Sequence, residues 1–455
     1  MQFISTRGMS PPTSFSDVLL AGLAPDGGLY LPQAWPQVSG NFAGLRYQDA
    51  AFRILSEFTR DSFSDTELRE AIEAAYADFD APDIAPLVQI GPRRYLLELF
   101  HGPTLAFKDI ALQVLGQLFS RALAKRGGRA TIVAATSGDT GSAAIAALGG
   151  LPNINVFVMH PKGRVSDIQR LQMTTSPHAN VHNIALEGSF DDAQSIVKTL
   201  FADKAFAGEV SMTAVNSINF ARIAAQCVYY FTATAQLGKP VTFVVPTGNF
   251  GDIFAGEAAS RMGLNVARLV IATNANDILA RTLNEGVYAS GASHATLSPS
   301  MDIQVASNFE RALFEASGRD ADWTAAAMQD FAATRKLALP APVLAELRAR
   351  YSAFASNDEE TRAAIAAIYK DTGRILDPHT AVGAAAAMKM GRPLSPIVIL
   401  STAHPAKFPQ AVREAIGEAP PEPGRLSGLK TLPERQEVLA NDPALIKRFI
   451  SSRVV

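Results

Sequence analysis

The sequence predicts an α/β protein built on parallel sheets, and three observations lead to this fold class. Strand-like runs alternate with helix-like segments from about residue 86 onward. These runs are largely apolar along their whole length, which is typical of strands buried on both faces of a parallel sheet. The chain has 455 residues, enough for two or three domains around more than one core.

The expected elements follow from the spacing of apolar residues. The clearest strands are residues 95–100, 129–135, 153–159, 179–185, 241–245, 267–272 and 395–400. Helical patterns occupy residues 110–119, 140–147, 190–201, 220–237 and 251–262. The stretch from about 280 to 375 is more irregular and helical. The parallel strands therefore form at least one large sheet flanked by helices.

Three regions are expected along the chain. Residues 1–85 form a leading domain with helices over 47–58 and 64–79, the second opened by a Ser64-Asp-Thr-Glu67 capping box. Residues 86–418 form the main α/β region. Residues 419–455 begin with a proline-stiffened linker and end in a helix over about 433–450.

Composition excludes several classes of function. The 41 basic and 43 acidic residues give a net charge of −2, so no electrostatic footprint for nucleic acid or anionic membrane is present. No apolar run is long enough for a membrane span, and the N-terminus has no signal-peptide pattern. Cys227 is the only cysteine, which excludes an internal disulfide and is consistent with a cytoplasmic location. No metal site is predicted, because no histidine or cysteine spacing suits one.

The segment His101-Gly-Pro-Thr-Leu-Ala-Phe-Lys-Asp109 lies at a switch from strand to helix, where α/β sheets carry their chemistry. Lys108 has the apolar neighbours Phe107 and Ile110. Desolvation by such neighbours lowers the pKa of a lysine and favours a neutral amine that can form a Schiff base. The alternative is a surface lysine that opens a helix beside Asp109.

Two glycine-containing loops also follow predicted strands. In Thr136-Ser-Gly-Asp-Thr-Gly-Ser142, hydroxyls, a carboxylate and free N–H groups meet at a helix start, which suits an anion such as a substrate carboxylate. The alternative there is a plain helix cap. In Val245-Pro-Thr-Gly-Asn-Phe-Gly-Asp252, two glycines allow backbone N–H groups to approach a phosphate, although a tight turn would also explain them. This loop lacks the Walker A and dinucleotide-binding patterns.

The nine residues from His101 to Asp109 closely resemble the lysine segment of the threonine synthase family. These are pyridoxal-phosphate (PLP) enzymes with the tryptophan-synthase-β type of fold. Ser5-Thr-Arg-Gly8 and the turn within residues 23–32 resemble the N-terminal domain of bacterial and fungal members. The resemblance spans nearly the whole chain, most firmly 86–275 and 375–408. It implies PLP fold type II: two α/β lobes with the cofactor between them, and an additional N-terminal domain.

The resemblance also implies roles for individual residues. Lys108 carries PLP and acts as the catalytic base. The expected phosphate cup for PLP is Thr247, Gly248, Asn249, Phe250 and Gly251. The expected site for the substrate carboxylate is Thr136, Ser137, Gly138, Asp139 and Thr140. Asp139 is also expected near the 3′-oxygen of PLP, where many relatives have Asn. A carboxylate beside that oxygen is unfavourable unless one of the two is protonated or otherwise paired.

Other polar residues complete the expected site. A hydroxyl after the last strand would bind the pyridine nitrogen of PLP, and Thr402 is assigned to it with Ser401 as the rival. His379 and His404 either bind substrate or are satisfied structural groups. Ser217, Asn219 and Arg222 would meet the substrate phosphate at a helix start, with Lys407 as a further candidate. The alternative for that helix start is a cap followed by an ordinary surface arginine.

The implied activity is the last step of threonine biosynthesis, in which O-phospho-L-homoserine and water give L-threonine and phosphate. The partner is therefore a small-molecule substrate, and the oligomeric state is left open. Two alternatives use the same fold: a threonine-synthase-like phospho-lyase that only eliminates, and a serine/threonine dehydratase. A third is a PLP- or phosphate-binding protein without catalysis, which the intact Lys108 and both loops argue against.

Overall fold

The computed structural model describes residues 1–213, 215–391 and 394–454. The larger lobe is built on a six-stranded sheet in the order β13-β10-β9-β14-β4-β3. These strands are β3 (Leu87–Gly91), β4 (Arg94–Glu98), β9 (Val241–Pro246), β10 (Val266–Thr273), β13 (Tyr351–Ala355) and β14 (Ile397–Ser401). Neighbouring strands are parallel except β3, which runs antiparallel to β4 at the edge.

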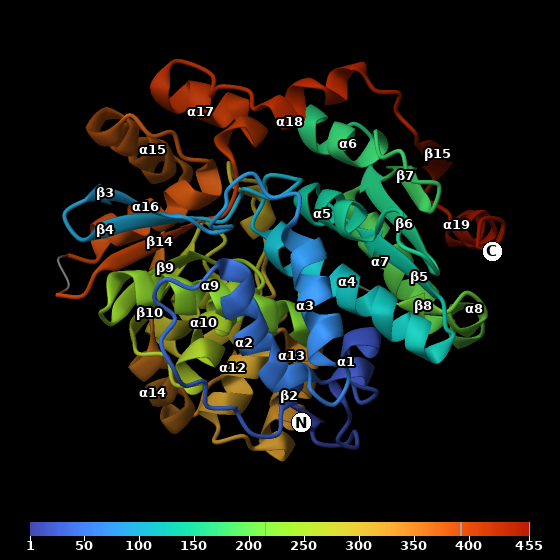
Figure 1. Cartoon of the computed structure of the whole chain (residues 1–455), viewed down its shortest axis with the longest axis horizontal. Coiled ribbons are helices and arrows are strands. Elements are labelled where there is room, and N and C mark those ends of the chain that lie inside the picture. Colours follow the sequence, from blue (N-terminus) through green and yellow to red (C-terminus); the bar gives the residue numbers. More distant parts are fainter. Residues whose placement is uncertain (214, 392–393, 455) are drawn as a thin grey trace.

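The smaller lobe, on the right of Figure 1, holds a fully parallel sheet in the order β15-β7-β6-β5-β8. Its strands are β5 (Ala130–Ala135), β6 (Ile154–Pro161), β7 (Val181–Glu187), β8 (Met212–Thr213) and β15 (Glu437–Ala440). The prediction of parallel sheets is thus confirmed. The strands are buried along almost their full length in β9 and β6, as expected of strands covered on both faces.

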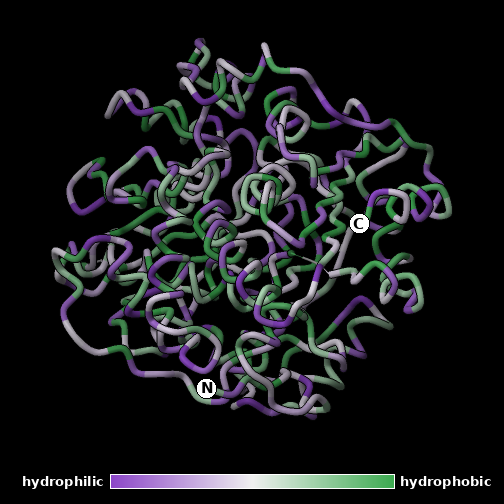
Figure 2. Tube along the Cα trace, turned by 45° about the vertical axis from the view of Figure 1, so that its right-hand side comes forward, coloured by the Kyte–Doolittle hydropathy of each residue, from purple (hydrophilic) through white to green (hydrophobic). Residues whose placement is uncertain are grey.

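Helices cover the sheets and fix the ends of the loops between them. In the main region these are α4 (Lys108–Arg126), α5 (Asp139–Leu148), α6 (Asp167–Thr174), α7 (Phe190–Ala202), α8 (Lys204–Glu209), α9 (Phe220–Leu237) and α10 (Gly251–Arg261). The later helices are α11 (Ile278–Glu285), α12 (Phe309–Ala316), α13 (Ala321–Thr334), α14 (Ala341–Arg350), α15 (Asp358–Thr372), α16 (Pro378–Lys389) and α17 (Pro409–Ile416). The hydrophobic segments turn toward the interior and the hydrophilic ones toward the outer loops (Figure 2). No helix in the described ranges is long and apolar enough to span a membrane.

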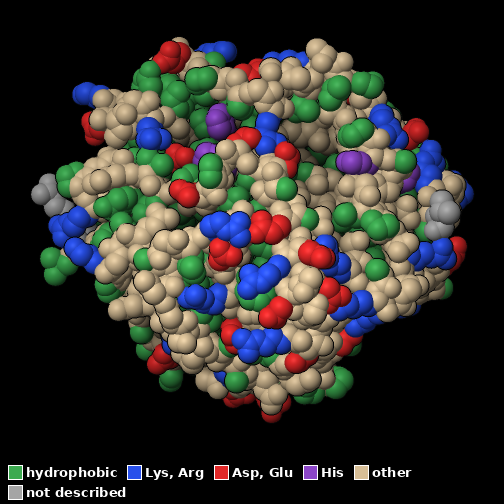
Figure 3. Space-filling model, in the orientation of Figure 1, with side chains coloured by type: hydrophobic (Ala, Val, Ile, Leu, Met, Phe, Trp, Pro, Cys, Tyr) green, Lys and Arg blue, Asp and Glu red, His purple; other side chains and the backbone are tan. Residues whose placement is uncertain are grey.

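The N-terminal region packs against helices α4 and α9 of the main region. It contains β1 (Phe3–Ser5), α1 (Phe15–Ala21), β2 (Tyr30–Pro32), α2 (Tyr47–Thr59) and α3 (Asp65–Tyr76). The predicted capping box is present, because Ser64 and Glu67 exchange hydrogen bonds at the start of α3. Positive and negative side chains lie intermixed over α2 and α3 (Figure 3), where Arg46 pairs with Asp49 and Glu73.

Two sequence predictions were wrong in part. The helix expected over 433–450 begins only at Pro443, as α19 (Pro443–Ser451), and Glu437–Ala440 is instead the edge strand β15 beside β7. The chain reaches that edge by passing across the top of Figure 1 through α18 (Gly424–Ser427) and the 3₁₀ helix η3 (Leu429–Thr431). The irregular stretch 280–375 includes β13, which completes the large sheet. Both strands are short and take their structure from pairing with a partner strand. The division of the chain into three regions, with boundaries after residues 85 and 418, stays a prediction.

Candidate active site

The polar groups predicted for the site lie where parallel strands end. Lys108 begins α4 after the loop that follows β4, and Thr402 directly follows β14. Gly251 begins α10 after β9, and Asp139 begins α5 after β5 of the smaller lobe. Carboxyl ends of parallel strands are where open α/β sheets bind ligands. The site therefore receives residues from both lobes.

Lys108 is a buried lysine, with 8% of its surface exposed. Burial lowers the pKa of its amine, and the positive charges of Lys407 and Arg222 lower it further against the opposing charge of Asp139. The Lys108 Nζ atom lies 3.5 Å from Asp139 Oδ2. The surface-lysine alternative is wrong, because the environment is the desolvated one that produces a reactive neutral amine.

Asp139 is paired by a second buried lysine. Lys407 Nζ lies 2.7 Å from Asp139 Oδ1, and Gln169 donates to the same oxygen at 2.8 Å. Burial alone would raise the pKa of Asp139, but the charges of Lys407 and Lys108 outweigh it and hold this pKa well below its usual range. Asp139 is therefore an anion with its own counter-ion, which meets the condition for placing it beside another negative oxygen.

Thr136, the first residue of the loop from Thr136 to Ser142, holds the loop backbone in place. Thr136 Oγ1 accepts hydrogen bonds from the backbone N–H groups of Gly138, at 3.0 Å, and Gly141, at 2.9 Å. Gly138 has φ +145°, and a Cβ there would meet the Gln169 side chain at 2.4 Å, so glycine is required. Ser137 is exposed and Thr140 is partly exposed at the tip of this loop, where a ligand can reach them.

The loop from Thr247 to Gly251 presents backbone donors. Within the described part of the chain, the N–H groups of Gly248, Asn249, Phe250 and Gly251 have no acceptor, and they lie at the N-terminus of α10. The Phe250 ring packs in the core against Phe309 and Tyr351, so this residue offers only its backbone. Thr247 Oγ1 already donates to the Val245 carbonyl at 2.6 Å and can only accept. This arrangement suits a phosphate group.

Thr402 and Ser401 differ in what their hydroxyls contact. Thr402 Oγ1 is buried and has no hydrogen-bond partner among the described residues. Ser401 Oγ lies 3.3 Å from Thr380 Oγ1 and lines a separate pocket. Successive residues of a strand point to opposite faces, so only one of the two can face the ligand. The unpartnered hydroxyl of Thr402 supports its assignment to the pyridine nitrogen of PLP.

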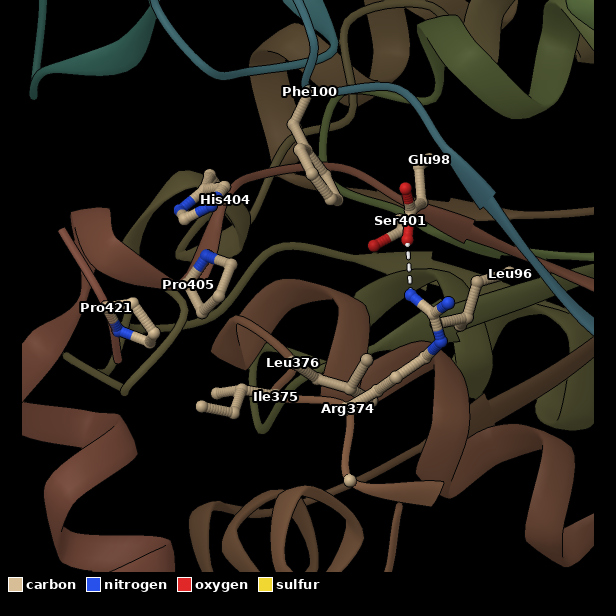
Figure 4. Close-up of a pocket in the computed structure, with 11 residues that line it drawn as sticks. Leu96, Glu98, Phe100, Arg374, Ile375, Leu376, Ser401, His404, Pro405 and Pro421 are labelled. Carbon is tan, nitrogen blue, oxygen red and sulfur yellow. Dashed lines mark hydrogen bonds and ion pairs between the residues drawn. The ribbon is translucent and has the colours of Figure 1, made fainter. Parts of the chain in front are cut away.

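The separate pocket, of about 360 Å³, lies beside the ends of β4 and β14 (Figure 4). It is lined by Leu96, Glu98, Phe100, Gly373, Arg374, Ile375, Leu376, Ser401, His404, Pro405 and Pro421. Arg374 Nη1 lies 3.1 Å from Glu98 Oε1, so the two charged groups pair with each other in the pocket. His404 Nδ1 accepts from the Ala406 N–H at 3.1 Å, which makes it a capping residue of the following turn. This contact supports the structural interpretation of His404.

His379 is also satisfied within the protein. Its Nδ1 lies 2.9 Å from Asp377 Oδ1, and its Nε2 accepts from the Ser300 N–H at 3.3 Å. Asp377 thereby fixes the tautomer of the ring. The same Ser300 closes over Gly248, where an added Cβ would meet the Ser300 carbonyl at 3.0 Å. His379 therefore supports the wall of the phosphate loop, and the substrate-binding alternative has no support from these contacts.

The first turn of α9, together with the segment before it (residues 216–219), brings an unpaired cation to the site. Arg222 is buried, its Nε and Nη1 atoms have no partner among the described residues, and burial lowers its pKa to about 10. Asn219 is occupied, because its side chain accepts from Ala221 N–H and donates to the Leu19 carbonyl. Ser217 Oγ lies 3.2 Å from Ser307 Oγ and remains partly exposed. Arg222 and Ser217 are thus free to meet an anion, whereas Asn219 is structural.

Sequence reasoning missed the residues that hold these loops. Gln169 orients Asp139, while Asn308 and Arg311 tie the phosphate loop to the segment before α9. They lie in the segments 164–173 and 301–311, whose residue spacing indicates no chemical role. Their role depends on contacts over long sequence separations, which only the fold reveals.

The groups described above fit PLP: a buried amine for its aldehyde, free backbone N–H groups for its phosphate and an unpartnered hydroxyl for its ring nitrogen. With two parallel-sheet lobes around them, they define a PLP-dependent enzyme of fold type II. Three family profiles match in succession. They are "Threonine synthase N terminus" at residues 2–76, "Pyridoxal-phosphate dependent enzyme" at 84–347 and "Threonine synthase, C-terminal" at 380–450.

Individual proteins agree with the profiles. A threonine synthase of Pseudomonas aeruginosa is 50% identical over 460 residues, covering 99% of this chain and 98% of that protein. The crystal structure of PLP-bound threonine synthase from Brucella melitensis matches with a TM-score of 0.98 and 47% identity, covering 100% of this chain and 99% of that one. The yeast enzyme matches with a TM-score of 0.94 and 38% identity, covering 99% and 98%. The chain belongs to the threonine synthase family.

Proposed function

We propose that this chain converts O-phospho-L-homoserine and water to L-threonine and phosphate with Lys108 as its catalytic group. The observation that carries the proposal is the buried Lys108 amine, which lies 3.5 Å from the Asp139 carboxylate. The reaction needs a cofactor that stabilises a carbanion, a base and two anion sites, one for each end of the substrate. The described residues offer a candidate for each.

The residues that would hold PLP are Lys108, the backbone of Gly248 to Gly251, and Thr402. When bound, PLP supplies an electron sink that stabilises negative charge on the substrate carbons. A hydroxyl rather than a carboxylate at the ring nitrogen leaves that nitrogen largely unprotonated and moderates the sink. The four free N–H groups at the start of α10 and its helix dipole favour a dianionic phosphate there.

The substrate has two anionic ends, and two separate groups are available for them. The backbone N–H groups and hydroxyls of Ser137 and Thr140, at the start of α5, suit the carboxylate. Arg222 and Ser217 suit the phosphate, because the buried Arg222 guanidinium lacks an anionic partner within the described ranges. Asn219 and Lys407 are left out of this assignment, since their polar atoms are bound within the protein.

Lys108 is placed to move protons as well as to bind. Because burial lowers the pKa of its amine, the free Nζ atom can act as the base that takes the Cα proton of the substrate. The same atom can return protons to neighbouring substrate atoms while the γ-phosphate leaves and water adds at Cβ. Asp139 remains an anion beside it and favours the ammonium that Lys108 becomes.

The central test compares two lysines of α4. Lys108→Ala should abolish turnover and the visible absorbance band of the PLP-loaded protein, whereas Lys125→Ala, which removes a surface ion pair with Glu67, should leave both unchanged. Product assays of phosphate, 2-oxobutyrate and threonine separate the proposed activity from the phospho-lyase and dehydratase alternatives, which the family assignment does not favour. Persistence of the visible band in Lys108→Ala would contradict the assignment of the lysine. A cytoplasmic location remains a prediction.

A further inference from the structure

Lys407 is a buried charge that joins the two lobes. It ends the 3₁₀ helix η2 (Pro405–Lys407), which follows β14 of the larger lobe, and its side chain is 0% exposed. Its ammonium lies 2.7 Å from Asp139 Oδ1, at the start of α5 in the smaller lobe. It also donates to the Thr104 carbonyl at 2.8 Å. Because both contacts lie inside the protein, the Lys407 ammonium is not available as a surface charge or as a substrate-binding cation.

The pair of Lys407 and Asp139 is costly to separate. A buried ion loses its hydration, and removing one member of such a pair leaves the other uncompensated. Burial alone would raise the pKa of Asp139, and the Lys407 charge is the largest contribution that opposes it. Lys108, at 3.5 Å, contributes less, and its own charge changes when it reacts. Lys407 is therefore the permanent counter-ion of Asp139.

The contacts of Asp139 determine whether a proton resides on Asp139 or on Lys108. Lys407 and Gln169 both contact Asp139 Oδ1, which leaves Oδ2 facing the Lys108 amine. Without a permanent counter-ion, a buried carboxylate at that distance would compete with Lys108 for the proton that Lys108 takes from a substrate. With Lys407 present, Asp139 stays ionised whether Lys108 is neutral or charged, and the proton stays on the base.

We propose that Lys407 is a positioning residue that keeps Asp139 ionised and aimed at Lys108 throughout the catalytic cycle. It acts through Asp139 and touches neither substrate nor cofactor. The inference rests on the proposed function only for the role of Lys108. The coupling between Lys407 and Asp139 is a property of the folded chain, so it can be measured separately from turnover.

The first test is a double-mutant cycle on the full chain saturated with PLP. Lys407→Met and Asp139→Asn should each lower the urea midpoint of unfolding, and the double variant should lose clearly less than the sum of both. Lys447→Met, which removes a lysine paired with Asp203 on the far side of the smaller lobe, is the matched control and should leave the site unaffected. Additive losses would overturn the proposal.

Folding failures are also informative. If Lys407→Met does not fold but Lys407→Met/Asp139→Asn does, the uncompensated Asp139 charge is the cause and the proposal stands. If Asp139→Asn folds and the double variant does not, Lys407 has a structural role independent of Asp139, and the proposal is wrong.

The second test follows the pH dependence of the loaded enzyme. In Lys407→Met, the acid-side transition of the visible band and the acid limb of kcat should move upward by at least about one pH unit, since Asp139 then takes up a proton more readily. The value of kcat should fall about tenfold or more, while KM stays within about threefold. In the double variant this upward shift should disappear. An unchanged titration in Lys407→Met would refute the inference, whereas a retained visible band in Lys108→Ala would instead refute the proposed function.

Discussion

Asn308 holds Asn249 with two hydrogen bonds to one oxygen: its backbone N–H and its side-chain amide each donate to the Asn249 carbonyl at 3.0 Å. The same amide also donates to the Ser217 carbonyl at 3.1 Å. The phosphate loop and the segment before α9 thus share one clamp. Arg311 supports it by donating to Asn308 Oδ1 and, at 2.7 Å, to the Ile218 carbonyl. Two loops proposed for two different phosphates are therefore mechanically linked.

Replacing Asn308 by Ala should weaken binding at both anion sites together. The loss of the three hydrogen bonds of the Asn308 side chain, to Asn249, Ser217 and Arg311, should destabilise the fold by about 1–3 kcal/mol, lower PLP affinity about tenfold and raise KM for phosphohomoserine. PLP titration, urea unfolding and steady-state kinetics measure these effects. Asn357→Ala, which removes the N-cap of α15, is the control: it should cost about 1 kcal/mol and leave PLP affinity unchanged. Equal PLP affinities in both variants would contradict the clamp.

Whether a site residue could be predicted depends on how far along the chain it lies from the loop that it contacts. The lysine segment and both glycine loops are contiguous strand–loop–helix units, so local pattern located them and the family resemblance supplied their roles. Asn308, just before α12, and Gln169, in α6, contact these loops from far along the chain, and nothing in their own neighbourhood indicates a ligand. Lys407 was one of the candidates for the substrate phosphate, but the anion that it contacts is Asp139.

The same contrast between local and long-range determinants applies to the helices and strands. Both limits of helix α9, Phe220 and Leu237, were predicted to the residue because the apolar spacing of this helix is long and regular. The strands β13 and β15 were missed because their short segments lack the continuous apolar character of a central strand. Each becomes a strand by pairing with β10 or β7, so its structure is decided by tertiary contacts.

Thr402→Val should separate ligand binding from stability. The Thr402 hydroxyl has no partner within the described residues, so removing it should leave the stability of PLP-free protein unchanged or slightly raised. PLP affinity should fall about tenfold, the equivalent of one hydrogen bond of about 1.4 kcal/mol. Ser401→Ala, whose hydroxyl lies 3.3 Å from Thr380 Oγ1, should show the reverse pattern of a small stability loss with little change in affinity. Equilibrium unfolding and PLP titration measure both. The opposite result would assign Ser401 to the ring nitrogen.

Gly248→Ala tests how closely the phosphate loop is packed. An added Cβ would meet the Ser300 carbonyl at 3.0 Å and Met301 Cα at 3.4 Å, both backbone atoms that cannot turn away. The loop should shift by a few tenths of an ångström, misalign its free N–H groups and lower PLP affinity at least about tenfold. In Gly128→Ala the nearest atom would be Leu123 Cδ2 at 3.6 Å, an ordinary contact, so this control should bind PLP normally. Isothermal titration with PLP compares the two, and equal affinities would contradict the packing argument.

Asp252 gives the stability of the chain a defined pH dependence. It follows Gly251 in the first turn of α10, and its Oδ1 accepts from the hydroxyls of Tyr229 and Tyr230 while Oδ2 has no described partner. Burial raises its pKa to about 6 from an ordinary value of 3.8, against the opposing effect of the two tyrosine hydrogen bonds. The native state therefore binds this proton more tightly than the unfolded chain does. Its contribution favours folding at low pH and is lost as pH rises through about 4 to 6.

Asp252→Asn should remove this dependence, because an amide keeps the Oδ1 acceptor but does not ionise. Relative to the variant, the wild-type chain should lose about 1 kcal/mol of unfolding free energy between pH 5 and pH 8, and about 3 kcal/mol over the whole titration. The unsatisfied Nδ2 donor of the new amide adds a cost that is the same at both pH values, so the difference isolates the proton. Urea unfolding of PLP-free protein at the two pH values gives the measurement, with Asp330→Asn on the exposed face of α13 as the control. A wild-type-minus-variant difference that stays constant with pH would show that Asp252 is ionised in the native state throughout.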